Sequence, residues 1–190
     1  MADTGANGFI SVGEPDNATN ALKEASEFLN KVPADIYGWK WFVIALHNGV
    51  YCFMLHGLLA TDGLGIWQDE KRDIKGTPVS HSDRIADFLE AFNRLQQPQY
   101  TQNNQFDAND LHKDGMRRLN NELRNDFVHF HPDGKEIPIP YIVDASLPAL
   151  DVIKHIASLG HKRIFDGDSA RQSVLETVDG IGRRLAELRD

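Results

Sequence analysis

The segment Trp41–Ala60 constrains the fold most, because it is almost continuously apolar. Its interruptions are His47, Asn48, Gly49, His56 and Gly57. A run of about 20 apolar residues is long enough to span a bilayer, but two histidines and an asparagine are costly in lipid. We therefore predict a central helix from Ala34 to about Thr61, buried on most sides by a helical bundle, and no membrane association.

Helical spacing of apolar residues predicts five further helices around this one. The first is expected to run from Asp16 or Asn17 to Val32, and the second from Ser80 or Ser82 to Leu95. The third is expected from Asp107 or Asp110 to Pro132, the fourth from Asp144 or Ser146 to Gly160, and the fifth from Asp166 or Asp168 to the C-terminus. The segments between them are predicted to be a charged loop over Gly65–Pro78 and a polar surface loop over Gln96–Gln105. Ile137–Val143 is expected to be extended, because of its prolines.

Length and composition place this chain among soluble proteins with one domain. A chain of 190 residues is large enough to bury a core without disulfides. We expect residues 1–15 to form a disordered tail, without the features of a signal peptide, and residues 16–190 to form one all-α, up-and-down bundle of about six helices. The single Cys52 can form no internal disulfide, which fits a cytoplasmic location.

The charge balance limits which partners the chain can bind. A net charge of −8 argues against non-specific duplex binding, which depends on many phosphate contacts from Lys and Arg. It leaves room for a small site in which one Arg binds one phosphate. It also leaves room for a basic partner.

The helix predicted to end at Pro132 carries two different faces. Its apolar stripe consists of Met116, Leu119, Leu123, Phe127 and Phe130. At about 100° per residue, Arg124 and His129 lie about 140° apart, on either side of a strip of Asn121, Asn125 and Val128. An ordinary solvated face carries Glu and Lys, whereas this one gathers a guanidinium, two amides and an imidazole.

The sequence Arg-Asn-Asp-Phe-Val-His, from Arg124 to His129, resembles the signature of the HEPN superfamily. That signature is an Arg, four to six intervening residues and a His, often with a small polar residue directly after the Arg. The resemblance covers residues 34–190. It implies a small helical bundle that usually dimerises, and many HEPN proteins are metal-independent endoribonucleases of prokaryotic defence and toxin–antitoxin systems.

The chemistry of RNA cleavage suits these residue types. When a 2′-hydroxyl attacks the adjacent phosphorus, the reaction needs a base with a pKa near neutrality and a fixed cation for the phosphoryl oxygens. His129 is the predicted general base or acid, Arg124 the phosphate clamp, and Asn125 the residue that orients it. The resemblance implies that a homodimer builds the cleft from two copies of this helix.

Further polar residues are predicted to bind an RNA substrate, and two alternatives stay open. The predicted substrate-binding residues are Asn121, His131, His47 and Asn48. His131 also satisfies the HEPN spacing, but Pro132 disturbs its helical geometry, so His129 is preferred. His129, His131 and Asp133 could instead be metal ligands, although no other Cys or His cluster completes such a set, and we expect no metal or cofactor.

A non-catalytic function competes with the nuclease. An Arg and a His near a helix C-terminus interact favourably with its negative end without any catalytic purpose. The same helix face could therefore bind RNA, a nucleotide or a regulatory protein. In HEPN toxins that are modified by a nucleotidyltransferase antitoxin, a Tyr commonly stands two residues after the His. His131 takes that place here, so an antitoxin that acts in this way is in doubt.

Overall fold

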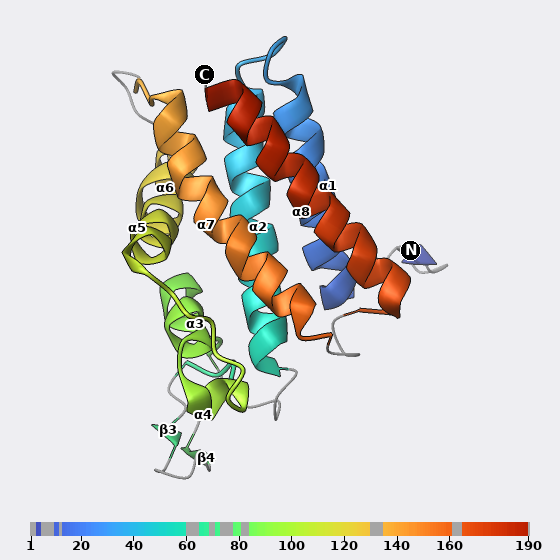
Figure 1. Cartoon of the computed structure of the whole chain (residues 1–190), viewed down its shortest axis with the longest axis vertical. Helices are drawn as coiled ribbons and strands as arrows, with labels where there is room; N and C mark the ends of the chain where they lie inside the picture. The colour runs from blue at the N-terminus through green and yellow to red at the C-terminus, as the bar shows by residue number, and fades with distance from the viewer. Residues whose placement is uncertain are drawn as a thin grey trace.

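The computed structural model of this chain is a bundle of helices (Figure 1). It describes residues 3–4, 10–11, 13–59, 65–68, 71–72, 78–80, 84–129, 135–160 and 165–189. Its α-helices are α1 (Glu14–Lys31), α2 (Gly38–Leu59), α3 (Phe88–Leu95), α4 (Pro98–Thr101), α5 (Asp110–Arg118), α6 (Arg124–Val128), α7 (Ile139–Ser158) and α8 (Asp168–Arg189). The predicted all-α bundle is confirmed.

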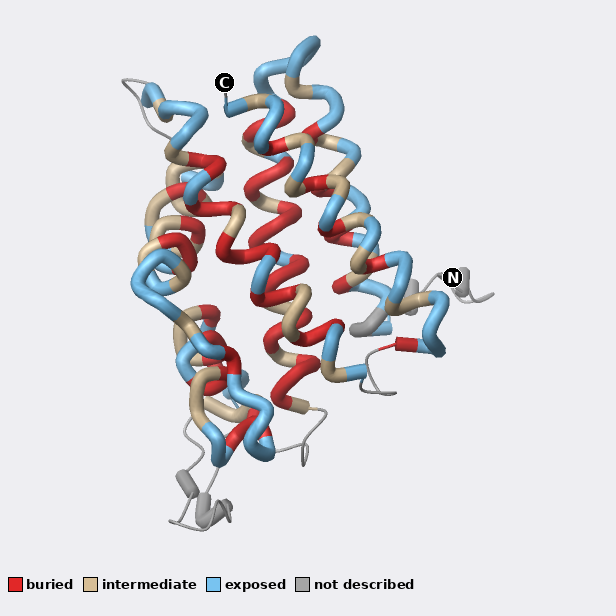
Figure 2. The backbone as a smooth tube through the Cα atoms, viewed as in Figure 1, coloured by how far each residue is buried: buried red, intermediate tan, exposed pale blue. Residues whose placement is uncertain are grey.

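Helix α2 occupies the centre of the molecule. It packs against α1 and α7, while α3 and α6 contact its other flank (Figure 1). Buried backbone continues along most of its length (Figure 2). Among the described helices, α2 is the one long and apolar enough to cross a bilayer, with a mean hydropathy of 1.5. However, 67% of that apolar window is buried inside the bundle, so packing accounts for its composition.

Small residues let the helices around α2 approach closely. A Cβ added at Gly49 of α2 would lie 3.4 Å from the backbone nitrogen of Leu22 in α1. A Cβ added at Gly115 of α5 would lie 2.6 Å from Cγ of Pro148 in α7, closer than two carbon atoms can pack. Gly115 therefore fixes the distance between the helix that carries the Arg124 motif and α7.

Buried Arg94 fastens the start of the loop that follows α2. It is 1% exposed and donates hydrogen bonds to the carbonyl oxygens of Gly65, Trp67 and Gln68, and its Nε also donates to Glu90 at 2.8 Å. A buried guanidinium must have its donors satisfied, and these backbone acceptors satisfy them. This part of the predicted Gly65–Pro78 loop is therefore held against α3.

Helices α7 and α3 begin at other residues than predicted. Helix α7 begins at Ile139, so the extended segment predicted over Ile137–Val143 is wrong: prolines are tolerated in the first turn of a helix, which lacks intrahelical N–H partners. Helix α3 begins at Phe88 rather than at Ser80 or Ser82, because the Asp87 side chain caps it by accepting from Glu90 N–H.

The Gln96–Gln105 loop is not wholly a surface segment. It contains α4, where Tyr100 and Thr101 are buried. Two short antiparallel pairs of strands were also not predicted. They are β1 (Asp3–Thr4) with β2 (Ile10–Ser11), and β3 (Lys71–Arg72) with β4 (Pro78–Ser80). The predicted tail over residues 1–15 lies largely outside the described residues, apart from β1, β2 and the start of α1.

Candidate functional site

The helix that carries Arg124 contains a π turn. Between α5 and α6, Leu119–Leu123 forms a π-helix, in which the backbone N–H of Arg124 bonds to the carbonyl of Leu119. The extra residue in this turn changes the angle between residues on either side of it, so the regular spacing of 100° per residue does not hold there. Single π turns inside helices recur at functional sites.

A chain of side-chain hydrogen bonds runs along this turn. Arg124 Nη1 donates to Asn125 Oδ1 at 3.1 Å, and Asn125 Nδ2 donates to the carbonyl oxygen of Asn121 at 3.0 Å. Asn120 Nδ2 donates to Asn121 Oδ1 at 2.7 Å, and His47 Nε2 lies 2.9 Å from Asn120 Oδ1. We call these five residues the Asn121 cluster. The structure therefore brings together four of the predicted site residues and adds Asn120.

Arg124 is unusual among the described arginines of this region because no carboxylate pairs with it. It is half-buried, and its hydrogen-bond partner is the neutral amide of Asn125. By contrast, Arg117 pairs with Asp114 and Glu122. A guanidinium has five N–H donors in a planar fork, so most of those of Arg124 remain available to an anion.

His47 is a buried member of the cluster. It is 8% exposed, and its ring stacks on Phe88 with centroids 4.5 Å apart and an interplanar angle of 12°. Burial has the largest effect and lowers its pKa below the usual value of 6.5; the Asn120 and Asn48 amides oppose this, and the charge of Arg124 adds the smallest lowering effect. The Nδ1 atom is buried without a hydrogen bond of normal geometry to any described residue.

The His129 side chain has no hydrogen bond to the Asn121 cluster among the described residues. His129 follows the last residue of α6 in an extended conformation, with φ −90° and ψ 148°, and it is exposed. Its backbone N–H donates to the carbonyl oxygen of Asn125 at 2.9 Å, and no hydrogen bond or ion pair between described residues joins its side chain to Arg124. The joint action of Arg124 as phosphate clamp and His129 as general base stays a prediction, and His131 lies outside the described residues.

His129 lines a separate cleft between the start of α2 and the end of α6. The cleft has a volume of about 530 Å³. Its other linings include Tyr37, which is 70% exposed, together with Lys40 and Val128. An exposed aromatic ring beside a lysine and a histidine offers a contact surface for a nucleotide base and its phosphate.

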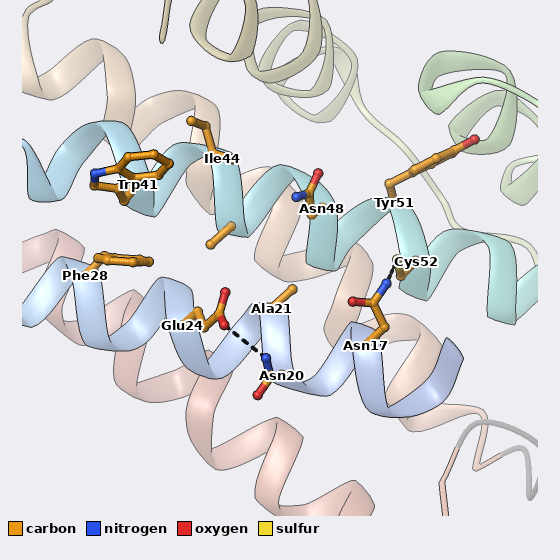
Figure 3. Close-up of a pocket in the computed structure, with 11 residues that line it drawn as sticks. Asn17, Asn20, Ala21, Glu24, Phe28, Trp41, Ile44, Asn48, Tyr51 and Cys52 are labelled. Atoms are coloured by element: carbon orange, nitrogen blue, oxygen red, sulfur yellow. Dashed lines mark hydrogen bonds between the residues drawn. The ribbon is translucent and has the colours of Figure 1, made fainter. Parts of the chain in front are cut away.

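The Asn48 amide acts on the His47 ring and raises its pKa, but Asn48 also faces a groove between α1 and α2. This groove has a volume of about 510 Å³, and in it Asn48 lies across from Asn17 and Asn20 (Figure 3). Trp41 and Phe28 form one end of this groove, with ring centroids 6.2 Å apart. Asn48 and His47 were predicted to bind the same substrate, but successive helix positions lie about 100° apart and face different surfaces.

Sequence reasoning missed Asn120 and Phe88. The packing of Phe88 against the His47 imidazole depends on how α2 and α3 cross. Asn120 offered a weak signal, because two consecutive asparagines inside a helix are unfavourable there. Paired amides in a helix interior indicate that their side chains bond to something other than solvent.

A metal centre has little support among the described residues. No three His, Cys, Asp or Glu side chains of the described ranges lie close enough together to hold one metal ion. The alternative set of His129, His131 and Asp133 includes two residues outside those ranges.

Comparisons with known proteins found no match. No protein-family model, no curated protein and no solved structure resembles the chain closely enough to count as one. The resemblance to HEPN proteins therefore rests on the spacing of Arg124, Asn125 and His129 and on the helical bundle that carries them.

Proposed function

We propose that this chain is a metal-independent endoribonuclease of HEPN type that acts as a cytoplasmic homodimer. The observation that carries the proposal is the half-buried Arg124 guanidinium, which pairs with no carboxylate of the described residues and is set beside Asn121 and Asn125 at a π turn. A cation that is not neutralised by its own protein is suited to an anionic ligand, and the planar fork of Arg matches phosphate oxygens.

The open hydrogen-bonding groups of the Asn121 cluster are mainly donors. The side-chain oxygens of Asn120, Asn121 and Asn125 are each engaged within the cluster. The remaining N–H groups of Arg124 and the exposed Asn121 amide NH₂ are free to donate. Such a surface favours phosphate oxygens over a cation, and it supports Asn121 as a second phosphate contact.

In the proposed reaction, the 2′-hydroxyl of a ribose attacks the adjacent phosphorus. The O2′–P bond forms and the P–O5′ bond breaks, which leaves a 2′,3′-cyclic phosphate and a free 5′-hydroxyl. One imidazole takes the 2′ proton and another gives a proton to O5′, while Arg124 stabilises the negative charge on the phosphoryl oxygens.

The homodimer is part of the proposal because one chain supplies one Arg124 and one His129. A two-fold dimer would supply two of each. Several large apolar side chains near the two clefts are exposed and could be covered by a second copy: Ile36, Tyr37, Trp41 and Val128. The oligomeric state is measured by light scattering on a size-exclusion column.

The test is cleavage of a mixed-sequence RNA in EDTA, between pH 5 and 9. We expect activity in the native chain, and its loss in both Arg124→Ala and His129→Ala. Arg117→Ala is the matched control, because Arg117 lies on the same run of helix but is neutralised by two carboxylates. Activity that survives Arg124→Ala, or that requires a divalent metal, would refute the proposed mechanism.

A non-catalytic RNA-binding or regulatory module is the second candidate. It is supported by the absence of a hydrogen bond or ion pair between the His129 and Arg124 side chains among the described residues, since a binding site needs the clamp but no base. In that case a folded chain cleaves no RNA, yet binds an oligonucleotide in a manner that depends on Arg124 and not on His129. An antitoxin or regulatory protein that presents acidic side chains would be expected to compete for the same surface.

A further inference from the structure

We propose that His47 positions Arg124, through Asn120 and the π turn, as an uncharged hydrogen-bond donor. The functional meaning of this role rests on the proposed phosphate site, but the role itself can be measured without any catalysis. His47 is a positioning residue in this proposal, because it has no path to a phosphate except through Asn120.

The direction of the hydrogen bonds in the first arm follows from the end at Arg124. A guanidinium can only donate, so Asn125 must present its oxygen to it. The Nδ2 atom of Asn125 is then turned to the carbonyl of Asn121, at 3.0 Å. This arm holds the guanidinium to the backbone of the π turn rather than to another mobile side chain.

The second arm reaches the same residue from the core. Asn120 Nδ2 donates to Asn121 Oδ1, which leaves Asn120 Oδ1 to face His47. An amide oxygen can only accept, so His47 Nε2 must carry the hydrogen. In the neutral ring the proton is then absent from Nδ1, which agrees with a buried Nδ1 atom that has no well-aligned partner.

The arrangement gives the π turn a rigid anchor. A π turn interrupts the regular ladder of backbone hydrogen bonds, so it needs tertiary contacts to persist. Asn120 and Asn121 both lie within Leu119–Leu123, and the ring of His47 is fixed between α2 and Phe88. The orientation of the residue that follows the turn, Arg124, is thus coupled to the buried core.

Protonation of His47 would oppose this role in two ways. The new Nδ1–H would be buried with poor hydrogen-bonding geometry. It would also place a second positive charge near Arg124, the charged group that acts on this ring. Both effects favour the neutral ring while the cluster is intact.

Two variants and one control separate positioning from general destabilisation. His47→Phe keeps a ring that can stack on Phe88 but removes the donor. His47→Gln keeps a donor to Asn120 without an imidazole. His56→Phe is the control, because His56 is buried on the same helix but has no hydrogen bond to the Asn121 cluster among the described residues.

The first readout is the tautomer of His47 in the full chain, from long-range ¹H–¹⁵N NMR. We expect the hydrogen on Nε2 at pH 7. The side-chain NH₂ signals of Asn120 and Asn121 should be dispersed in the native chain and in His56→Phe, and should collapse toward solvent values in His47→Phe. A hydrogen on Nδ1, or unchanged amide signals in His47→Phe, overturns the proposal.

The second readout is affinity for a 2′-O-methyl RNA oligonucleotide, which cannot be cleaved by 2′-hydroxyl attack. We expect His47→Phe to weaken binding about tenfold, and His47→Gln to restore most of it. Equal affinities of the native chain and His47→Phe overturn the positioning role. If the native chain binds no oligonucleotide, the proposed function fails, and the NMR measurement alone decides the role of His47.

Discussion

Arg124 and Asn125 are neighbours in sequence, and their side chains are joined by a hydrogen bond of 3.1 Å from Nη1 to Oδ1. The acceptor is neutral, so the charge of Arg124 is fixed in position without being cancelled. Arg117, on the preceding helix α5, shows the opposite arrangement: it donates hydrogen bonds to Asp114 and Glu122, which raise its pKa and balance its charge. The two arginines differ in their partners rather than in their helical environment.

Asn125→Asp should convert Arg124 into a second neutralised arginine. The new carboxylate would accept from Nη1 and compete with phosphate for the guanidinium. We expect affinity for an uncleavable RNA oligonucleotide to fall about tenfold or more, with the midpoint of thermal unfolding unchanged or slightly lower, because the variant cannot donate to the Asn121 carbonyl. Binding is measured by fluorescence anisotropy at fixed ionic strength.

The control for that variant is Asn93→Asp, which makes the same change of charge on the exposed surface of α3. It separates the local effect from the general repulsion of RNA by an acidic protein. Equal loss of binding in both variants would mean that net charge, and not the pairing of Arg124, determines affinity.

Gly115→Ala should destabilise the bundle by about 1–3 kcal/mol. The added Cβ would lie 2.6 Å from Cγ and 3.0 Å from Cβ of Pro148, and a proline inside α7 cannot move to a different rotamer to make room. The free energy of unfolding is measured by urea titration. Gly180→Ala in α8 is the matched control, since nothing lies within 4 Å of its added Cβ and helix propensity should stabilise it by up to about 1 kcal/mol.

Arg94→Met should cost about 3 kcal/mol or more of unfolding free energy. The substitution preserves much of the buried volume, but it leaves the carbonyls of Gly65, Trp67 and Gln68 without their donor, and each such loss is worth about 1–3 kcal/mol when the group stays buried. Arg189→Met removes an exposed ion pair with Asp144, 3.1 Å long, and should cost less than about 1 kcal/mol. A similar cost for both would show that the carbonyls find water instead.

The helices that the sequence predicts well are those with a long apolar stripe. Met116, Leu119 and Leu123 were assigned to the core from their spacing, and all are fully buried. Such positions can be predicted because apolar residues recur every three or four residues along a helix, whatever elements pack against it. The boundaries that failed, at Ile139 and Phe88, depend on short-range alternatives: prolines in a first turn, and a choice among several polar residues that could cap a helix.

The candidate site could be predicted only in part, for a different reason. Arg124, Asn125 and Asn121 share a helix, so their proximity follows from the sequence. The hydrogen bond between His47 and Asn120 joins residues 73 positions apart in the sequence. It also depends on the π turn, which the spacing of apolar residues does not predict. The extended conformation of His129 likewise depends on where α6 ends, because His129 directly follows the last residue of that helix.

The lowered pKa of His47 predicts how the stability of this protein changes with pH. Above about pH 6.5, the ring is neutral in both the folded and the unfolded chain, and it contributes no pH dependence. As the pH falls below this value, the unfolded chain takes up a proton that the folded chain resists, because burial disfavours the charged ring. The free energy of unfolding should therefore decrease toward acid, by up to about 1.4 kcal/mol per pH unit.

Urea titrations between pH 5 and 7 separate this effect from that of the carboxylates. The pKa values of Asp114 and Asp179 lie below their usual value of 3.8, so these groups change the free energy of unfolding only below pH 5. His47→Gln has no group to protonate at this position, so its free energy of unfolding should change less over the window than that of the native chain. If His47→Gln keeps the full native slope, another histidine is the source of the pH dependence, and His47 is not held neutral by its burial beside Arg124.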